Sequence, residues 1–332
     1  MEIPKPYLLF LGDAPDDLAA KTAIGVYEWC PEDCVGQLRL PGCAPKLDIA
    51  ELDIEAAAAN GAKTVLIGVA NRGGVIPDSW QSTLVDALER GMDLASGLHT
   101  RLDSVPAIAE AAERNGRSLH DVRHFDGDLP IGNGRPRSGR RILTVGTDCS
   151  VGKMYTALAL HRGLKARGVP SEFKATGQTG IFIEGSGISV DAVVSDFISG
   201  AVEELCPASP DDHWAVVEGQ GSLFHPSYAG VSLGLLHGAQ PDYLVLCHEP
   251  TRTHMRGLPD QALPTLERCL EANLAAARVV REDTRCAGVA INTRALSDDD
   301  ADRVLKRTED ELGLPCIDPV RHGVERIVDD LL

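Results

Sequence analysis

The sequence contains no apolar stretch near the roughly 20 residues that a helix needs to cross a bilayer. It is also poor in basic residues: 32 lysines and arginines stand against 49 aspartates and glutamates, which gives a formal net charge of −17. Proteins bind nucleic acids and anionic membranes largely through positive charge, so this balance excludes both as expected partners. Any anionic ligand therefore needs a local basic pocket.

The nine cysteines lack a regular spacing. Cys30, Cys34 and Cys43 have neither a partner histidine nor a second close cysteine pair, as a zinc site would require. An odd number of cysteines also argues against a disulfide framework. The first residues lead almost directly into a strand-like run, so we expect no targeting peptide and a cytoplasmic protein.

Strand-like and helix-like segments alternate through residues 1–126, which predicts a Rossmann-like N-terminal domain with a parallel sheet. The expected strands are 7–11, 34–40, 64–69, 93–95 and 118–122. The expected helices are 16–27, 54–59, 80–90 and 105–114. Residues 127–140 are rich in glycine, proline and arginine and have no apolar period, so we interpret them as a linker.

Residues 141–332 predict a second α/β domain, a doubly wound P-loop NTPase-like C-terminal domain. Strands are expected at 142–145, 172–175, 214–217, 243–246 and 287–291. A helix is expected over 192–205 and a final helix over 299–312. Glycine-rich and polar segments follow these strands, at the carboxyl edge where such sheets bind ligands.

The most informative motif runs from Gly146 to Met154, between an apolar strand and a helix-like segment. This arrangement surrounds a phosphate with backbone N–H groups and directs a helix N-terminus at it. Five residues rather than the usual four separate Gly146 from Gly152, and Met154 stands where a Ser or Thr hydroxyl normally holds Mg²⁺. A thioether is a poor ligand for a hard cation, so the motif predicts a phosphate site without its usual metal ligand.

Four segments resemble dethiobiotin synthetase and its P-loop relatives, namely 146–153, 173–180, 217–221 and 288–292. A longer set, in order along nearly the whole chain, resembles the D-glutamate N-acetyltransferase family, namely 7–13, 67–74, 95–99, 146–155, 218–226 and 248–257. The second resemblance implies a two-domain P-loop enzyme that moves an acetyl group from acetyl-CoA to the α-amino group of an amino acid, D-glutamate in that family.

The resemblance implies that acetyl-CoA binds at the phosphate loop as a co-substrate. Its thioester reacts with amines without phosphoryl transfer, so the reaction does not need the metal ion that phosphoryl transfer uses. We therefore expect no metal; the alternative is that Asp148 or Glu218 supplies a metal site instead. The residues expected to bind the donor are Thr147, Cys149, Ser150, Val151, Gly152, Lys153, Met154 and Tyr155.

Acetyl transfer needs a general base near the attacking amine. Glu218 is the first candidate, followed by His225 and Asp148. The backbone N–H groups of residues 219–222 are the expected donors to the tetrahedral oxyanion. Cys149 lies beside a helix N-terminus, which leaves open an acetyl-cysteine intermediate, although we favour the alternative that it is a small residue filling the loop.

A glutamate acceptor has two carboxylates, which call for arginines that bind them bidentately. Arg72 and Arg252 each follow an apolar strand, and for either the alternative is an interdomain or surface salt bridge. Asn71, Gly73, Lys174 and Gln178 complete the expected substrate-binding set. We expect the active site between the two domains, with residues 71–74 facing residues 218–225, in a homodimer that acts on small molecules.

Two other functions fit parts of this pattern. A Mg-ATP-dependent ligase that activates a carboxylate would agree with the likeness to dethiobiotin synthetase, but Met154 argues against it. A nucleotide-switched regulator would bind nucleotide tightly and turn it over slowly. The many polar residues after the expected strands of both domains favour an enzyme.

Overall fold

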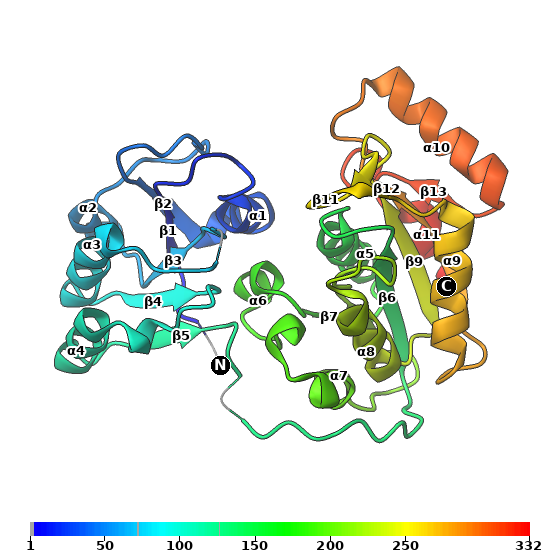
Figure 1. The fold of residues 1–332 in the computed structure, drawn as a ribbon, viewed down its shortest axis with the longest axis horizontal. Coiled ribbons are helices and arrows are strands. Elements are labelled where there is room, and N and C mark those ends of the chain that lie inside the picture. Colours follow the sequence, from blue (N-terminus) through cyan, green and yellow to red (C-terminus); the bar gives the residue numbers. More distant parts are fainter. Residues whose placement is uncertain (1–2, 72, 126) are drawn as a thin grey trace. The chain divides into compact units, whose positions relative to one another are not determined.

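The computed structural model describes residues 3–71, 73–125 and 127–332. The chain divides into two compact units (Figure 1). Unit 1 comprises Met1–Asp126 and Gly177–Ser189, and unit 2 comprises Gly127–Thr176 and Val190–Leu332. Each unit is built on a parallel sheet with helices between its strands, which confirms the predicted α/β class. Within the described residues, no helix is both long and apolar enough to span a membrane.

Unit 1 contains a five-stranded parallel sheet in the order β2-β1-β3-β4-β5. Its strands are β1 (Tyr7–Gly12), β2 (Cys34–Arg39), β3 (Thr64–Ile67), β4 (Asp93–Ser96) and β5 (Leu119–Asp121). Every residue of β1, β3 and β4 is buried, as expected for a parallel sheet that is covered on both faces. All five strands lie where the sequence predicted them, with small shifts at their ends.

The helices of unit 1 are α1 (Lys21–Trp29), α2 (Ile54–Ala59), α3 (Asp78–Glu89), α4 (Pro106–Asn115) and α6 (Gln178–Glu184). Helix α1 begins at Lys21 rather than at residue 16, because the Asp16 carboxylate accepts a hydrogen bond from the Ala19 amide and holds a separate turn. Helix α6 comes from much later in the chain and packs against α1 (Figure 1). Its buried Phe182 also accepts a hydrogen bond, through its carbonyl, from the Tyr7 hydroxyl at 3.2 Å. The sequence analysis predicted neither α6 nor its place in unit 1.

Unit 2 contains a six-stranded parallel sheet in the order β13-β12-β9-β6-β8-β7. Its strands are β6 (Arg140–Gly146), β7 (Ser171–Lys174), β8 (Trp214–Val217), β9 (Tyr243–His248), β12 (Arg285–Ile291) and β13 (Cys316–Ile317). A short antiparallel hairpin, β10 (His254–Met255) and β11 (Leu258–Ala262), follows β9. From β6 the chain goes first to the edge strand β7 and returns to β8, which lies between them. It then crosses to β9 on the other side of β6, so the direction of the connections reverses between β6 and β9. Ligands bind to such sheets at the carboxyl ends of the strands beside this reversal.

The helices of unit 2 are α5 (Lys153–Ala166), α7 (Ile198–Leu205), α8 (Ala229–Ala239), α9 (Leu266–Arg278), α10 (Asp298–Leu312) and α11 (Glu325–Leu331). Two sequence predictions were wrong here. The helix expected over 192–205 is regular only from Ile198, after two 3-10 turns at Val190–Ala192 and Ser195–Phe197. The helix α10 is not the last, because α11 follows it and buries Ile327 and Val328 beside α5 and β12.

The segment that the sequence marks as a linker is fastened to unit 2. Residues 127–139 form neither helix nor strand. The Glu203 carboxylate on α7 accepts hydrogen bonds from the amides of Asn133 and Gly134, both at 2.9 Å. The Arg137 guanidinium donates to the carbonyl oxygens of Glu203 at 3.0 Å and Cys206 at 2.7 Å. The first two bonds satisfy backbone amides of a segment that has no ladder or helix of its own, and the Arg137 bonds satisfy carbonyls at the end of α7.

Candidate functional site

The phosphate loop occupies the reversal point of unit 2. β6 ends at Gly146, residues 147–152 form the loop, and α5 begins at Lys153. Gly152, which precedes the helix, has a φ of +103°, a conformation that side chains rarely allow. The first turn of α5 therefore presents its backbone N–H groups and the positive end of the helix dipole to the space inside the loop.

Lys153 is folded into this loop. Its side chain is 6% exposed, and its ammonium donates a hydrogen bond to the Asp148 carbonyl at 2.7 Å. Burial lowers the pKa of the Lys153 ammonium. An anion that enters the loop would therefore meet a desolvated cation as well as backbone donors.

Neighbouring strand ends hold the loop from both sides. The Thr147 hydroxyl lies 2.9 Å from Nδ1 of His248, the last residue of β9, and burial lowers the pKa of that histidine to about 4. On the other side, the Ser222 hydroxyl donates to the Thr147 carbonyl at 3.1 Å. The loop is thus fixed by β9 and by the segment that follows β8.

The Asp148 side chain is fully buried and all its hydrogen bonds are made within the protein. One carboxylate oxygen accepts from the Cys149 amide at 2.7 Å. The other accepts from Arg252 Nη1 at 2.8 Å and from the Arg256 amide at 2.7 Å. Burial by itself raises the pKa of this carboxyl, but these hydrogen bonds outweigh it and hold the pKa below its usual value. Asp148 is therefore ionised and serves to position the two arginine-bearing segments.

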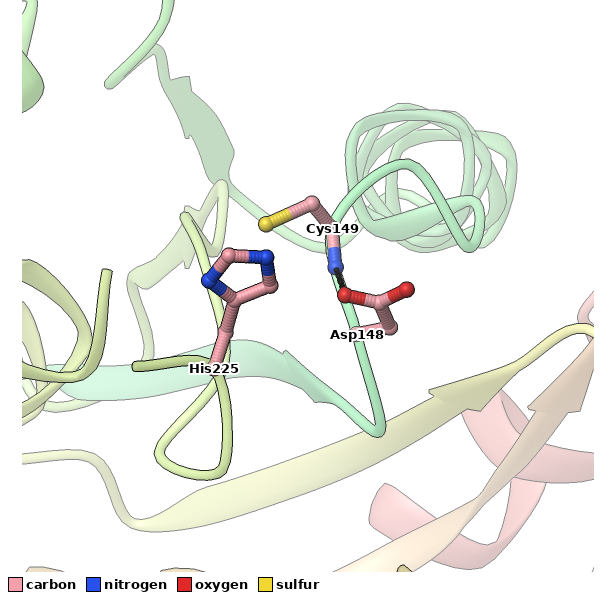
Figure 2. A group of neighbouring side chains, drawn as sticks. All are labelled: Asp148, Cys149 and His225. Carbon is pink, nitrogen blue, oxygen red and sulfur yellow. Dashed lines mark hydrogen bonds between the residues drawn. The ribbon is translucent and has the colours of Figure 1, made fainter. Parts of the chain in front are cut away.

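Figure 2 shows the Cys149 thiol directed toward the imidazole of His225, with Asp148 beside them. The potential metal-ligating atoms of these three residues lie within 4.8 Å of one another. His225 uses both ring nitrogens, because Nδ1 accepts from the Ser227 amide at 3.2 Å and Nε2 lies 3.1 Å from the Arg256 carbonyl. These bonds assign the proton to Nε2.

This trio does not suit a metal ion, because its donor atoms are engaged elsewhere. The Asp148 oxygens already accept three hydrogen bonds, and the His225 nitrogen that could ligate already accepts one. Burial raises the pKa of the Cys149 thiol, an effect that Lys153 partly offsets.

Glu218 follows β8 directly and is 4% exposed. Its carboxylate accepts hydrogen bonds from the Thr176 amide at 3.0 Å and from the Gln220 side chain at 3.1 Å. The Thr176 hydroxyl donates to the Glu218 carbonyl at 2.6 Å, so both ends of the residue are held by the loop after β7. The bonds from Thr176 and Gln220 fix the orientation of the carboxylate.

Gly219 brings this loop against the phosphate loop. A Cβ atom here would lie 1.7 Å from the Thr144 carbonyl oxygen and 3.0 Å from Cδ of Lys153. The Gly219 amide donates to the Thr144 hydroxyl at 2.9 Å. The Gly219 N–H therefore already has an acceptor within the protein. Of the N–H groups predicted to donate to the oxyanion, those of residues 220–222 remain candidates.

The predicted donor-binding residues are together at the loop. Val151 is buried, Ser150 is exposed with a φ of +54°, and Met154 and Tyr155 are half-buried in the first turn of α5. The thioether of Met154 follows Lys153 directly in that turn, at the position where a P-loop would carry its metal-ligating hydroxyl.

The predicted substrate-binding residues are divided among three places. The Arg252 guanidinium braces the phosphate loop through Asp148 and the carbonyls of Cys149 at 2.6 Å and Ser150 at 3.2 Å, and it also pairs with Glu249. Both ion pairs of Arg252 lie within unit 2. Lys174, elsewhere in unit 2, pairs with Glu172.

The other three described residues belong to unit 1. Asn71 closes its own loop by bonding both backbone groups of Val75, at 2.9 and 3.0 Å, and Gly73 beside it has a φ of +85°. Gln178 begins α6 and lies against Gly97, where a Cβ would come within 2.0 Å of its side-chain oxygen. Arg72 lies outside the described residues.

Sequence reasoning missed Arg256, whose backbone N–H and C=O contact Asp148 and His225. The segment 248–257 carried part of the family resemblance, and that was the available signal. Its partner Asp148 lies more than 100 positions earlier, so only the fold brings the two together.

A strand, a glycine-containing loop and a helix that begins with a buried lysine, at the reversal point of a parallel sheet, define unit 2 as a P-loop domain. Family models agree with both units. A P-loop domain described as domain of unknown function DUF1611_C matches residues 130–328, and a Rossmann-like domain described as DUF1611_N matches residues 39–125.

Known proteins similar to this chain extend over its full length. A protein of Tritonibacter scottomollicae named D-glutamate N-acetyltransferase is 55% identical over 329 residues, covering 99% of each chain. A Pseudoalteromonas protein of the same name is 46% identical over 331 residues, covering 100% of each. The crystal structure of a DUF1611 family protein from Anabaena variabilis superimposes with a TM-score of 0.89 at 33% identity, covering 99% of each chain. The chain belongs to the D-glutamate N-acetyltransferase family, as its motifs predicted.

Proposed function

We propose that this protein transfers the acetyl group of acetyl-CoA to the α-amino group of D-glutamate. The observation that carries the proposal is the full-length similarity to two proteins named D-glutamate N-acetyltransferase, at 55% and 46% identity. The contacts in unit 2 support it, because they combine an anion-binding loop with an oriented carboxylate and suit a reaction that needs no metal ion.

The phosphate loop is the proposed site for the diphosphate of the acetyl donor. Lys153 and the backbone N–H groups at the start of α5 supply positive charge and hydrogen-bond donors. Met154 deprives the loop of the hydroxyl that holds Mg²⁺ in ATP-using relatives. Amine attack on a thioester moves no phosphoryl group, so the absence of this ligand leaves the proposed chemistry intact.

Glu218 is the proposed general base. Asp148 is held ionised by an arginine and two amides, and His225 uses both ring nitrogens, so neither offers a free acceptor for a proton. Glu218 accepts from Thr176 and Gln220 and precedes Gly219, where an added Cβ would lie 3.0 Å from Cδ of Lys153. The hydrogen bonds that Arg252 and two amides donate to Asp148 outweigh its burial and hold its pKa low, so its carboxylate is a poor proton acceptor and Glu218 is the proposed base of the two carboxylates.

The proposed reaction has two steps. The amine nitrogen of D-glutamate attacks the thioester carbonyl carbon and loses a proton to Glu218, while the N–H groups of residues 220–222 donate to the carbonyl oxygen. The tetrahedral intermediate then breaks its carbon–sulfur bond, and the coenzyme A thiolate takes up the proton that Glu218 received, which restores the carboxylate. Arg72 is the proposed partner of an acceptor carboxylate, since Arg252 is committed to bracing the phosphate loop.

The test follows free thiol release from acetyl-CoA by the purified protein in EDTA, with D- and L-glutamate separately. The proposal expects release with D-glutamate in the absence of metal and ATP. Release with neither enantiomer, together with ATP hydrolysis once Mg²⁺ is restored, would instead establish the ligase alternative.

Glu218→Gln is the matching variant, because the amide keeps the size of the side chain and removes the base. We expect kcat to fall by about 10²- to 10⁴-fold, the usual contribution of a general base. Glu204→Gln, which neutralises an exposed carboxylate on α7, is the control and should keep full turnover. Equal turnover by the two variants would remove Glu218 from the mechanism.

A further inference from the structure

The hairpin β10–β11 places Arg256 at the mouth of the phosphate loop. Met255, the residue before it, is 2% exposed and anchors the hairpin, and Gly257 after it has a φ of +77° that allows the tight turn. The Arg256 amide donates to the Asp148 carboxylate at 2.7 Å, and its carbonyl accepts from His225 Nε2 at 3.1 Å. Two buried side chains thus fix the backbone of this one residue.

The side chain of Arg256 extends onto the loop and contacts the hydroxyl of Ser150. Ser150 is exposed and adopts a left-handed backbone conformation. Throughout residues 3–71, 73–125 and 127–332, no carboxylate forms an ion pair with the Arg256 guanidinium. Arg252, four positions earlier, differs because it is paired with both Asp148 and Glu249.

The basic residues around the loop therefore differ in their ability to bind an anion. Arg252 is paired with Asp148 and Glu249, whereas no carboxylate of the described residues forms an ion pair with Lys153 or Arg256. A diphosphate brings two negative charges, and a P-loop normally balances them with its lysine and with Mg²⁺. Met154 removes the ligand for that ion, and Arg256 lies on the same loop.

We propose that the Arg256 guanidinium binds the diphosphate of the acetyl donor and supplies the positive charge that Mg²⁺ supplies in other P-loop proteins. This inference rests on the proposed function for the identity of the ligand, and on the contacts of Asp148, His225 and Ser150 for its geometry. A guanidinium suits the role because its planar N–H groups bind two phosphate oxygens at once. Asp148 and His225 then act as positioning residues for Arg256.

The experiment measures binding by calorimetry in EDTA, so it does not depend on turnover. The ligands are coenzyme A, 3′-dephospho-coenzyme A and pantetheine, which carry the diphosphate with the 3′-phosphate, the diphosphate alone and no phosphate. Arg256→Gln keeps the backbone contacts to Asp148 and His225 and removes the charge. Arg307→Gln, an exposed residue of α10, makes the same change of net charge away from the loop and is the control.

We expect Arg256→Gln to weaken coenzyme A and dephospho-coenzyme A equally, by about 10- to 100-fold, the range for hydrogen bonds to a charged group. The affinity for pantetheine should not change. The affinity of Arg256→Lys for coenzyme A should lie between those of the wild type and Arg256→Gln, and the affinity of Arg307→Gln should equal that of the wild type. Wild-type affinity in Arg256→Gln would overturn the inference. A loss confined to coenzyme A would also overturn it, because Arg256 would then bind the 3′-phosphate.

A further arm separates this inference from the proposed function. If no coenzyme A compound binds, ADP serves as the diphosphate probe. If ADP binds in EDTA and its affinity falls in Arg256→Gln, the role of Arg256 in binding a diphosphate is supported, although the proposed acetyl donor is wrong. ADP binding that needs Mg²⁺ and ignores Arg256 would refute both.

Discussion

Asp148→Asn tests whether Asp148 positions the site or performs the chemistry. The substitution keeps the shape of the side chain and replaces one acceptor oxygen by an NH₂ donor. In the structure, one oxygen accepts from Arg252 Nη1 at 2.8 Å and from the Arg256 amide at 2.7 Å. An asparagine that keeps its bond to the Cys149 amide would turn its NH₂ group toward these two donors.

The magnitude follows from these two bonds. Hydrogen bonds to a charged group contribute about 1.5–3 kcal/mol each, and removing one partner of a buried ion pair costs about 3–5 kcal/mol. Both figures describe the same Arg252 and Arg256 contacts, so we expect the free energy of unfolding of unit 2 to fall by about 3–5 kcal/mol. For a unit of this size, the melting temperature then falls by about 6–20 °C.

The assay combines scanning calorimetry with coenzyme A titration. Asp148→Asn should lower both the melting temperature and the affinity for coenzyme A, because Arg256 loses its backbone anchor. Glu203→Gln, which weakens a buried carboxylate's bonds to the Asn133 and Gly134 amides, should lower the melting temperature and leave the affinity intact. A variant Asp148→Asn with normal stability and affinity but a large loss in kcat would refute the positioning role.

Three further predictions concern other parts of unit 2. Burial lowers the pKa of His161 from near 6.5 to about 4, so its contribution to stability is complete above pH 6.5 and is lost as the pH falls toward 4. In His161→Gln, the urea concentration at the midpoint of unfolding should therefore depend less on pH between 6.5 and 4. Cys149→Ser should slow thiol release without abolishing it, because burial raises the pKa of the Cys149 thiol and disfavours a nucleophilic thiolate; mass spectrometry of acid-quenched wild-type enzyme that found acetylated Cys149 would contradict this. Gly219→Ala should abolish coenzyme A binding, because its Cβ would lie 1.7 Å from the Thr144 carbonyl oxygen, whereas Gly230→Ala on α8 meets open space and should bind normally in the same titration.

The sequence predicted strands such as β1 and β8 because each is a short apolar run that is buried in a parallel sheet. It failed where tertiary packing decides the outcome. Ile181 and Phe182 have the composition of any core segment, and nothing local indicates that α6 packs on α1 rather than within unit 2. The two 3-10 turns before α7 interrupt a stretch whose apolar residues alone favour a helix.

The phosphate loop could be predicted because its spacing and its lysine are local features of the chain. The roles of Asp148 and Arg252 could not, since a carboxylate near a loop lysine is compatible with a base, a metal ligand or a brace. The distinction depends on the hydrogen bonds that Arg252 and the Arg256 amide donate to it. The sequence contains these residues more than 100 positions apart, and the order of β6 and β9 in the sheet brings them together.

Because α6 belongs to unit 1 but interrupts unit 2 in the sequence, its position limits where the chain can be cut into separate units. The residue that bonds Glu218, Thr176, is the last of unit 2 before the chain enters unit 1, and the chain returns only at Val190. A fragment cut at the linker would keep Ile181 and Phe182 but lose the α1 surface that buries them. The segment anchoring Glu218 would then continue into an apolar helix exposed to water. Although each unit has its own core, a gene encoding one of them alone would yield a product prone to aggregate, which favours inheritance of both units as a single piece.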